Sequence, residues 1–283
     1  MKPIPLVAAV NDLSGFGRCS LTVALPILSA MGLQGCPLPT ALLSNHTGYP
    51  SCFFEDFTDR MEAYLAEWRK LNLRFGGACT GFLGNEKQAD IVAGFLSEFC
   101  DEGAVKLVDP VMADNGQPYS TCSPALCERM KTVVAQGTVT TPNLTEACLL
   151  TGRSYDAILS LPDPQKQEAV FAMADAIAAL GPRAVIVTGV VGDHKVANLV
   201  SDRGAHYAVE RPLVPCSFAG TGDVFSAVLF GLLMQNTPLK EAVERTAAFV
   251  ADATAHTMAL GLPAQDGIEF EPFLSRLTED ATV

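Results

Sequence analysis

The stretch Phe218-Ala219-Gly220-Thr221-Gly222-Asp223-Val224-Phe225 decides the fold, because a short glycine turn runs directly into an apolar segment. The almost wholly apolar residues from Val224 to Met234 predict a buried helix. Glycines at 220 and 222 let the backbone curl around a ligand, and the N–H groups at a helix start suit an anion. The turn therefore predicts an anion site, with Asp223 in the first helical turn as either a cap or a base.

Composition narrows the class of protein. The 283 residues allow one large α/β domain or two small ones, and 49% hydrophobic against 18% charged residues supplies a sizeable core. A net charge of −12 argues against a nucleic-acid partner. No apolar run has the length of a membrane span, and no signal peptide precedes the first strand pattern. Nine scattered cysteines without a CxxC pair indicate reduced thiols, so we expect a cytoplasmic protein.

Short apolar runs alternate with stripes at helical spacing along the whole chain. This alternation predicts an α/β fold, with a mostly parallel central sheet and helices on both faces. Polar residues follow five of the runs, at Asn11-Asp12, Thr80-Gly81, Asp109, Thr141-Asn143 and Thr188-Gly189. Ligands of such sheets bind at the carboxyl ends of the strands, so we expect these residues at one edge. We find no repeat or linker, and residues 1–283 are expected to form one domain.

Several boundaries follow from local signals. Leu6 to Val10 and Leu33 to Leu38 are expected strands, and a helix from Leu21 to Met31 should be kinked or divided at Pro26. The polar, glycine- and proline-bearing segment 41–51 is expected to be a loop that acts as a flap. Asp202-Arg203-Gly204 predicts a hairpin turn between two strands.

The motifs point to phosphoryl transfer. The chain has no P-loop and no complete dinucleotide fingerprint, and it lacks zinc-ligand spacings and the GxSxG signature. It offers carboxylates, Asn, Thr and helix starts, which can bind phosphate and Mg²⁺ and take a proton from an attacking hydroxyl. Asp109, Asp114 and Glu146 are the candidate metal ligands. The alternatives stay open: Asp109 can be an ordinary strand-end turn, and Asn143 with Glu146 can be a capping box.

Three motifs resemble the ribokinase-type small-molecule kinases: Gly220-Thr221-Gly222-Asp223, Asn143-Leu144-Thr145-Glu146 and Asp109-Pro110-Val111-Met112. Two further stretches are similar to the pyridoxal (vitamin B6) kinase branch, namely Leu43-Ser44-Asn45-His46-Thr47-Gly48-Tyr49 and Thr80-Gly81-Phe82-Leu83-Gly84. The similarity extends over nearly the whole chain in the expected order.

The resemblance implies a role for each matching residue. Asp223 would be the general base, and Gly220, Thr221 and Gly222 would form an anion hole for the transferred phosphoryl group. Asn143, Thr188 and Asp109 would contact the nucleotide, and Asp109, Asp114 and Glu146 would hold the metal. The substrate would meet Asp12, Ser14, His46, Thr47 and Phe82. The family also implies ATP, Mg²⁺, a monovalent cation such as K⁺ and a homodimer.

Two departures leave the substrate open. Asp12 stands where pyridoxal kinases usually carry Ser, and Phe82 stands where Tyr is frequent. The main hypothesis is ATP-dependent phosphorylation of the 5′-hydroxymethyl group of pyridoxal, pyridoxamine or pyridoxine. The first alternative is a hydroxymethylpyrimidine kinase of thiamine synthesis. Two more distant alternatives are a nicotinamide-dependent oxidoreductase and a non-catalytic ligand-binding protein.

Overall fold

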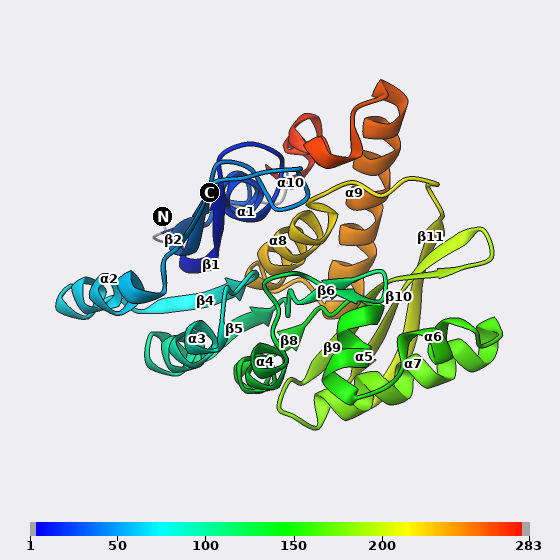
Figure 1. Cartoon of the computed structure of the whole chain (residues 1–283), viewed down its shortest axis with the longest axis horizontal. Coiled ribbons are helices and arrows are strands. Elements are labelled where there is room, and N and C mark those ends of the chain that lie inside the picture. Colours follow the sequence, from blue (N-terminus) through cyan, green and yellow to red (C-terminus); the bar gives the residue numbers. More distant parts are fainter. Residues whose placement is uncertain (1–3, 279–283) are drawn as a thin grey trace. The chain divides into compact units, whose positions relative to one another are not determined.

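The computed structural model describes residues 4–278 (Figure 1). Contacts between residues divide the chain into two compact units. Unit 1 contains the chain up to Gly81, the short stretch Glu98–Val105, and the chain from Val214 onward. Unit 2 contains Phe82–Ser97 and Lys106–Leu213. The single domain expected for residues 1–283 stays a prediction.

The strands of unit 1 follow the order β4-β1-β2-β3. β1 (Leu6–Ser14) pairs in parallel with β2 (Gln34–Leu43) and β4 (Phe75–Thr80), whereas β3 (Phe54–Asp56) is antiparallel to β2. The residues from Val7 to Val10 in β1 are buried, which explains the unbroken apolar sequence there.

The helices of unit 1 pack on these strands and on each other. They are α1 (Ser20–Ala30), α2 (Thr58–Lys70), α8 (Thr221–Met234), α9 (Leu239–Leu260) and the short α10 (Ser275–Thr278), with single 3₁₀ turns η1 (Ala264–Asp266) and η2 (Glu271–Phe273). Helix α8 contacts α1, α9 and β4, and it is buried from Val224 to Leu233. A helix that is apolar on all sides needs such surroundings. The predicted buried helix is therefore confirmed.

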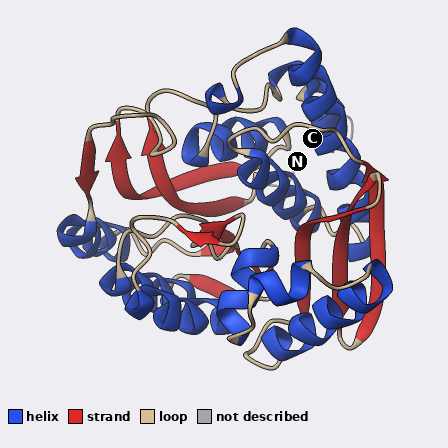
Figure 2. Cartoon of the chain, turned by 45° about the vertical axis from the view of Figure 1, so that its right-hand side comes forward, coloured by secondary structure: helices blue, strands red, loops and turns tan. Residues whose placement is uncertain are grey.

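The strands of unit 2 follow the order β5-β8-β9-β10-β11 and are drawn in red with the other strands in Figure 2. β5 (Cys100–Val108, of which Lys106 onward belongs to this unit), β8 (Val139–Thr140) and β9 (Ala184–Gly192) are parallel. β10 (Lys195–Asp202) and β11 (Ala205–Pro212) complete the sheet as an antiparallel hairpin. The predicted turn is confirmed, since Arg203 and Gly204 have φ of 51° and 83°, as a type I′ turn requires.

Helices and a small hairpin surround the strands of unit 2. The helices are α3 (Glu86–Glu98, all but its last residue in this unit), α4 (Pro124–Gln136), α5 (Leu144–Thr151), α6 (Tyr155–Leu159) and α7 (Asp163–Ala178), and the hairpin joins β6 (Ala113–Asp114) to β7 (Gln117–Pro118). The α/β class with mostly parallel strands is confirmed. Within residues 4–278, no helix combines the length and apolar character needed to cross a membrane.

Two expected strand ends are wrong. β1 continues to Ser14 instead of ending at Val10, with a bulge between Asn11 and Leu13 that lets pairing to β2 resume. β2 continues to Leu43, so the first three residues of the expected 41–51 flap belong to a strand. Helix α1 continues through Pro26 without a division, because burial of the residues that follow stabilises the helix beyond the lost hydrogen bond. The kink expected at Pro26 stays a prediction.

Candidate active site

Asp223 lies at the start of α8, in unit 1, but it does not cap the helix. The cap is Gly220, which adopts the left-handed conformation with φ of 73°, and no side chain bonds the cap. A Cβ at Gly220 would overlap the carbonyl oxygen of Arg18, so only glycine fits. A Cβ at Gly222 would meet no atom within 4 Å. The turn therefore leaves open space beside the first N–H groups of α8, and the cap interpretation of Asp223 is wrong.

Two donors hold the Asp223 carboxylate. Asn11 Nδ2 donates to Asp223 Oδ1 over 3.1 Å, and the backbone N–H of Ser20 also donates to this carboxylate. Burial raises the pKa of Asp223 to about 6 and the charge of Asp12 adds to the rise, while these two hydrogen bonds oppose it. A carboxyl with such a pKa is ionised at neutral pH and is a stronger base than an ordinary aspartate.

Asp12 is a second, deeper carboxylate in β1. Ser20 Oγ donates to Asp12 Oδ1 over 2.5 Å, and Ser14 Oγ donates to Asp12 Oδ2 over 2.8 Å. Burial raises the pKa of Asp12, and the two serine hydroxyls oppose the rise. Ser14 is fully buried, so it supports Asp12 from within the unit. The structure thus brings the two predicted residues Asp12 and Ser14 together.

Ser20 connects the two carboxylates, since its N–H donates to Asp223 and its hydroxyl donates to Asp12. It is the first residue of α1 and has φ of 54°, a left-handed value that is unfavourable for a side chain with a Cβ. Such an outlier persists only where its surroundings impose it, and it is frequent at functional sites. We call Asn11, Asp12, Ser14, Ser20 and Asp223 the base cluster.

The loop at residues 44–51 packs against Gly17, in the connection between β1 and α1. The N–H of Gly48 donates to His46 Nδ1 over 3.1 Å, so His46 Nε2 carries the proton and donates to the carbonyl of Gln265 over 2.7 Å. A Cβ at Gly17 would lie 2.7 Å from the His46 ring, so the two are in close contact. Thr47 is exposed. Backbone groups thus engage both nitrogens of His46, and only its ring surface is left for a ligand.

In unit 2, Glu146 belongs to a capping box, as the sequence alternative proposed. Asn143 Oδ1 accepts from the N–H of Glu146, and Glu146 Oε2 accepts from the N–H of Asn143 over 2.8 Å. Glu146 Oε1 also accepts from the N–H of Met112 over 3.0 Å. The Glu146 side chain is buried, and this burial together with the charge of Asp109 raises its pKa well above the ordinary value.

The predicted metal ligands are only partly brought together. Asp109 is buried and close enough to Glu146 for their charges to repel, which is an arrangement that a cation would relieve. Both carboxylate oxygens of Asp114 instead accept from its neighbour Asn115. Nowhere in residues 4–278 do three or more His, Cys, Asp or Glu side chains gather as a metal site would need. Mg²⁺ usually takes one or two carboxylates with waters and phosphate oxygens, so Asp109 and Glu146 fit it.

The remaining predicted residues lie in unit 2 as well. Thr188 and Asn143 form an isolated parallel β-bridge, and the N–H of Thr188 donates to the carbonyl of Pro142 over 2.9 Å. These two predicted nucleotide-binding residues are therefore neighbours. Phe82 is half-buried in the loop between β4 and α3.

Sequence reasoning missed the residues that hold Asp223. Asn11 was recognised only as a strand end, and nothing local in the sequence marks Ser20, because its role depends on a left-handed backbone. Asp266 and Gln265, which bond to the 44–51 loop, are more than 200 residues away along the chain. Only tertiary contacts could reveal them.

Comparisons with known proteins agree on one family. A family model described as phosphomethylpyrimidine kinase matches residues 27–267. A pyridoxine/pyridoxal/pyridoxamine kinase of Bordetella pertussis is 28% identical over 277 residues, covering 92% of this chain and 93% of its own.

Two solved structures are similar over nearly their whole length. A provisionally assigned phosphomethylpyrimidine kinase of Bacteroides thetaiotaomicron, crystallised with pyridoxal, has a TM-score of 0.90 and 38% identity, covering 97% of this chain and 96% of its own. Pyridoxal kinase from Lactobacillus plantarum has a TM-score of 0.88 and 28% identity, covering 98% of both chains. The expected ribokinase-type kinase resemblance is therefore confirmed.

Proposed function

The chain belongs to the phosphomethylpyrimidine kinase family, and from that premise we propose that it transfers the γ-phosphoryl group of ATP to the 5′-hydroxymethyl group of a vitamin B6 vitamer. The relatives support this substrate: one is named for pyridoxine, pyridoxal and pyridoxamine, and another was crystallised with pyridoxal. Family membership argues against the oxidoreductase alternative, and the presence of Asp223 argues against the non-catalytic one.

Asp223 is the observation that carries the proposal. In the proposed reaction its carboxylate takes the proton of the substrate hydroxyl while the oxygen attacks the γ-phosphorus. The pKa of about 6 supports this role, because the group is ionised near neutral pH yet basic enough to accept the proton. Gly220, Thr221 and Gly222 offer backbone N–H groups and a helix N-terminus to the negative charge of the phosphoryl group.

Substrate recognition is assigned to the base cluster and the 44–51 loop. Asp12 would hydrogen-bond a ring substituent, with Ser14 orienting its carboxylate. His46 and Thr47 would line the pocket for the pyridine ring, and Phe82 as a further substrate contact rests on the family resemblance alone. Because a carboxylate accepts but does not donate, the Asp12 departure favours ring groups that carry a proton.

Mg²⁺ and ATP are assigned to unit 2. Asp109 and Glu146 would hold the ion, directly or through water, while Asn143 and Thr188 would contact the nucleotide. Asp114 is a weaker metal candidate, since Asn115 engages both of its carboxylate oxygens. When bound, the ion would neutralise phosphate charge. K⁺ as an additional activating ion is a proposal that rests on the family resemblance.

The test compares four acceptors: pyridoxal, pyridoxamine, pyridoxine and hydroxymethylpyrimidine, each with ATP and Mg²⁺. We expect a phosphorylated product from at least one B6 vitamer, with a kcat/KM above that for the pyrimidine. Asp223→Asn serves as the blank, and repeating the assay with K⁺ replaced by Na⁺ checks the monovalent ion. A higher kcat/KM for hydroxymethylpyrimidine would shift the assignment to thiamine synthesis, and no product from any acceptor would refute the kinase proposal.

A homodimer and a cytoplasmic location complete the proposal. The dimer rests on the family resemblance, and light scattering on the purified chain measures it. The location is supported by the nine cysteines, all of which are free thiols. Cell fractionation tests it.

A further inference from the structure

Cys122 and Cys127 form a close pair of thiols beside the start of α4. Their Sγ atoms are 3.1 Å apart, and both side chains are half-buried. The backbone holds them in place: the N–H of Cys122 donates to the carbonyl of Tyr119, and the N–H of Cys127 donates to the carbonyl of Ser123, which caps α4. A disulfide has an S–S distance of about 2.05 Å, so closing the pair needs a shift of about 1 Å.

We propose that this pair is a dithiol modification site, which a low-molecular-weight disulfide oxidises to an intrachain disulfide. Cys127 Sγ attacks the reagent RSSR, which forms a mixed disulfide and releases one RSH. Cys122 Sγ then attacks Cys127 Sγ and releases the second RSH. The two thiols lose two electrons and two protons, and the reagent gains them as two RSH.

The surroundings of Cys122 favour a role as the second, intramolecular nucleophile. Burial raises the pKa of Cys122 to about 12, and its contact with Cys127 and the charge of Glu146 add to the rise. In the mixed disulfide, Cys122 Sγ lies next to Cys127 Sγ and is therefore placed to attack it. Its proximity makes that second step intramolecular, which compensates for a weakly ionised thiol.

The test exposes the whole chain to oxidised glutathione, blocks remaining thiols with N-ethylmaleimide and analyses tryptic peptides by mass spectrometry. Peptide 107–129 contains Cys122 and Cys127 and no other cysteine. We expect this peptide to lose two hydrogen atoms, to carry no maleimide and to regain both thiols with dithiothreitol. A peptide with two maleimides, or one that retains glutathione, would overturn the proposal.

Two variants make the result specific. Cys122→Ser should leave Cys127 as a mixed disulfide with glutathione, because the second attack is impossible. Cys36→Ser removes another half-buried thiol and should leave closure of the pair unchanged. If the Cys36→Ser variant no longer forms the disulfide between Cys122 and Cys127, the assigned pair is wrong. These outcomes do not depend on the kinase activity.

A separate observation concerns residues 264–271, which we call the C-terminal strap. The N–H of Ala219 donates to the carbonyl of Ala264 over 3.0 Å, and the N–H of Ile268 donates to the carbonyl of Ala219 over 3.1 Å. Ala219 immediately precedes Gly220, so the strap holds the turn at the start of α8. Tyr49 Oη donates to Asp266 Oδ1 over 2.7 Å, so the same strap also holds the 44–51 loop.

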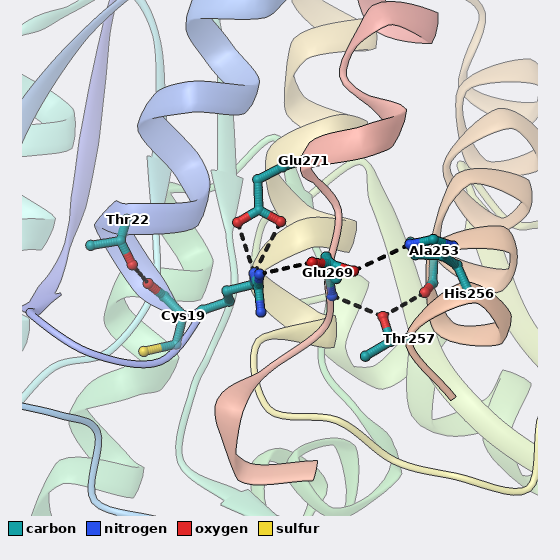
Figure 3. Close-up of polar contacts among 8 residues, drawn as sticks. Cys19, Thr22, Ala253, His256, Thr257, Glu269 and Glu271 are labelled. Atoms are coloured by element: carbon teal, nitrogen blue, oxygen red, sulfur yellow. Dashed lines mark hydrogen bonds and ion pairs between the residues drawn. The ribbon is translucent and has the colours of Figure 1, made fainter. Parts of the chain in front are cut away.

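Arg18 and α9 fix the strap in unit 1. Arg18 Nε donates to both carboxylate oxygens of Glu271, over 2.7 and 3.0 Å, and Arg18 Nη2 lies 3.3 Å from Glu269 Oε1. Glu269 also contacts His256 Nε2 at 3.2 Å, and its N–H donates to Thr257 Oγ1 on α9 over 2.8 Å (Figure 3). A strap held this firmly can transmit a displacement of the loop to the turn.

We infer that Tyr49 and Asp266 are positioning residues, which couple the 44–51 loop to the turn before α8; this inference rests on the proposed kinase function. Tyr49→Phe removes only the hydroxyl, and loss of one hydrogen bond predicts a threefold to tenfold fall in kcat/KM, roughly. Tyr64→Phe is the matched control, because Tyr64 Oη donates to the carbonyl of Pro37 over 2.9 Å, outside the strap.

Hydrogen exchange separates coupling from mere substrate contact. In Tyr49→Phe the amide of Ala219 should exchange faster, whereas in Tyr64→Phe it should match the wild type. Asp266→Asn keeps an acceptor for Tyr49 and should retain more activity than Asp266→Ala. An unchanged Ala219 exchange rate, or an unchanged kcat/KM, in Tyr49→Phe would overturn the inference. Wild-type activity, measured in the same series, tests the kinase proposal independently.

Discussion

Asp223→Asn should make the protein inactive and, at alkaline pH, more stable. The Asp223 carboxylate is ionised in a half-buried site, and its pKa of about 6 exceeds the ordinary value of 3.8. The folded state therefore binds this proton more tightly than the unfolded chain does. This tighter proton binding contributes its full amount to the free energy of unfolding below pH 3.8, and the contribution is lost as the pH rises through 6. An amide carries no charge, so the variant avoids this loss.

The size of the effect follows from the two pKa values. Moving from 3.8 to about 6 corresponds to about 3 kcal/mol at pH 8 and to about 1 kcal/mol at pH 4.5. The variant's stability relative to wild type should therefore improve by about 2 kcal/mol between pH 4.5 and pH 8, as an upper limit because the side chain keeps some contact with water. The Asn amide faces donors from Asn11 and Ser20, which costs about 1–3 kcal/mol at both pH values and cancels in the difference.

Urea unfolding of wild type and variant at the two pH values measures this difference, and steady-state assays should show a kcat at least about 100-fold lower. Asp252→Asn is the control, since Asp252 is exposed and paired with Arg276. It should lose no more than about 1 kcal/mol and should gain nothing at pH 8. An equal stability difference at pH 4.5 and pH 8 for Asp223→Asn would refute a buried charge at this position.

Three further predictions concern single residues. Asp12→Asn should move the acidic limb of the kcat/KM profile to lower pH, because the charge of Asp12 helps to raise the pKa of Asp223; a profile that stays in place excludes this influence. Gly220→Ala should lower Tm strongly, since a Cβ there overlaps the Arg18 carbonyl, whereas Gly222→Ala should fold normally; similar Tm values would contradict the described turn. Asn143→Ala removes the cap of α5 and should cost about 1 kcal/mol in urea unfolding, with no change meaning that the cap contributes nothing.

The sequence predicted most of the elements because their signals are local. The apolar run before Asn11 predicted β1, the turn at Asp202-Arg203-Gly204 predicted the β10–β11 hairpin, and the glycine turn predicted the start of α8. The errors lie at the ends of strands, where pairing with a neighbouring strand decides how far each strand extends. β1 and β2 extend beyond their apolar cores because each has a neighbour to bond with, which polar residues at the strand ends do not reveal.

By itself, the sequence determined the class of fold, the family resemblance and the glycine turn that carries Asp223, because periodicity and short motifs are encoded in neighbouring residues. Only the tertiary structure decided what surrounds that carboxylate. Asn11 and Ser20 approach it from distant parts of the chain, and Asp12 lies deep enough for its charge to matter. The basicity of Asp223 depends on burial and on those partners, and neither exists until the chain has folded.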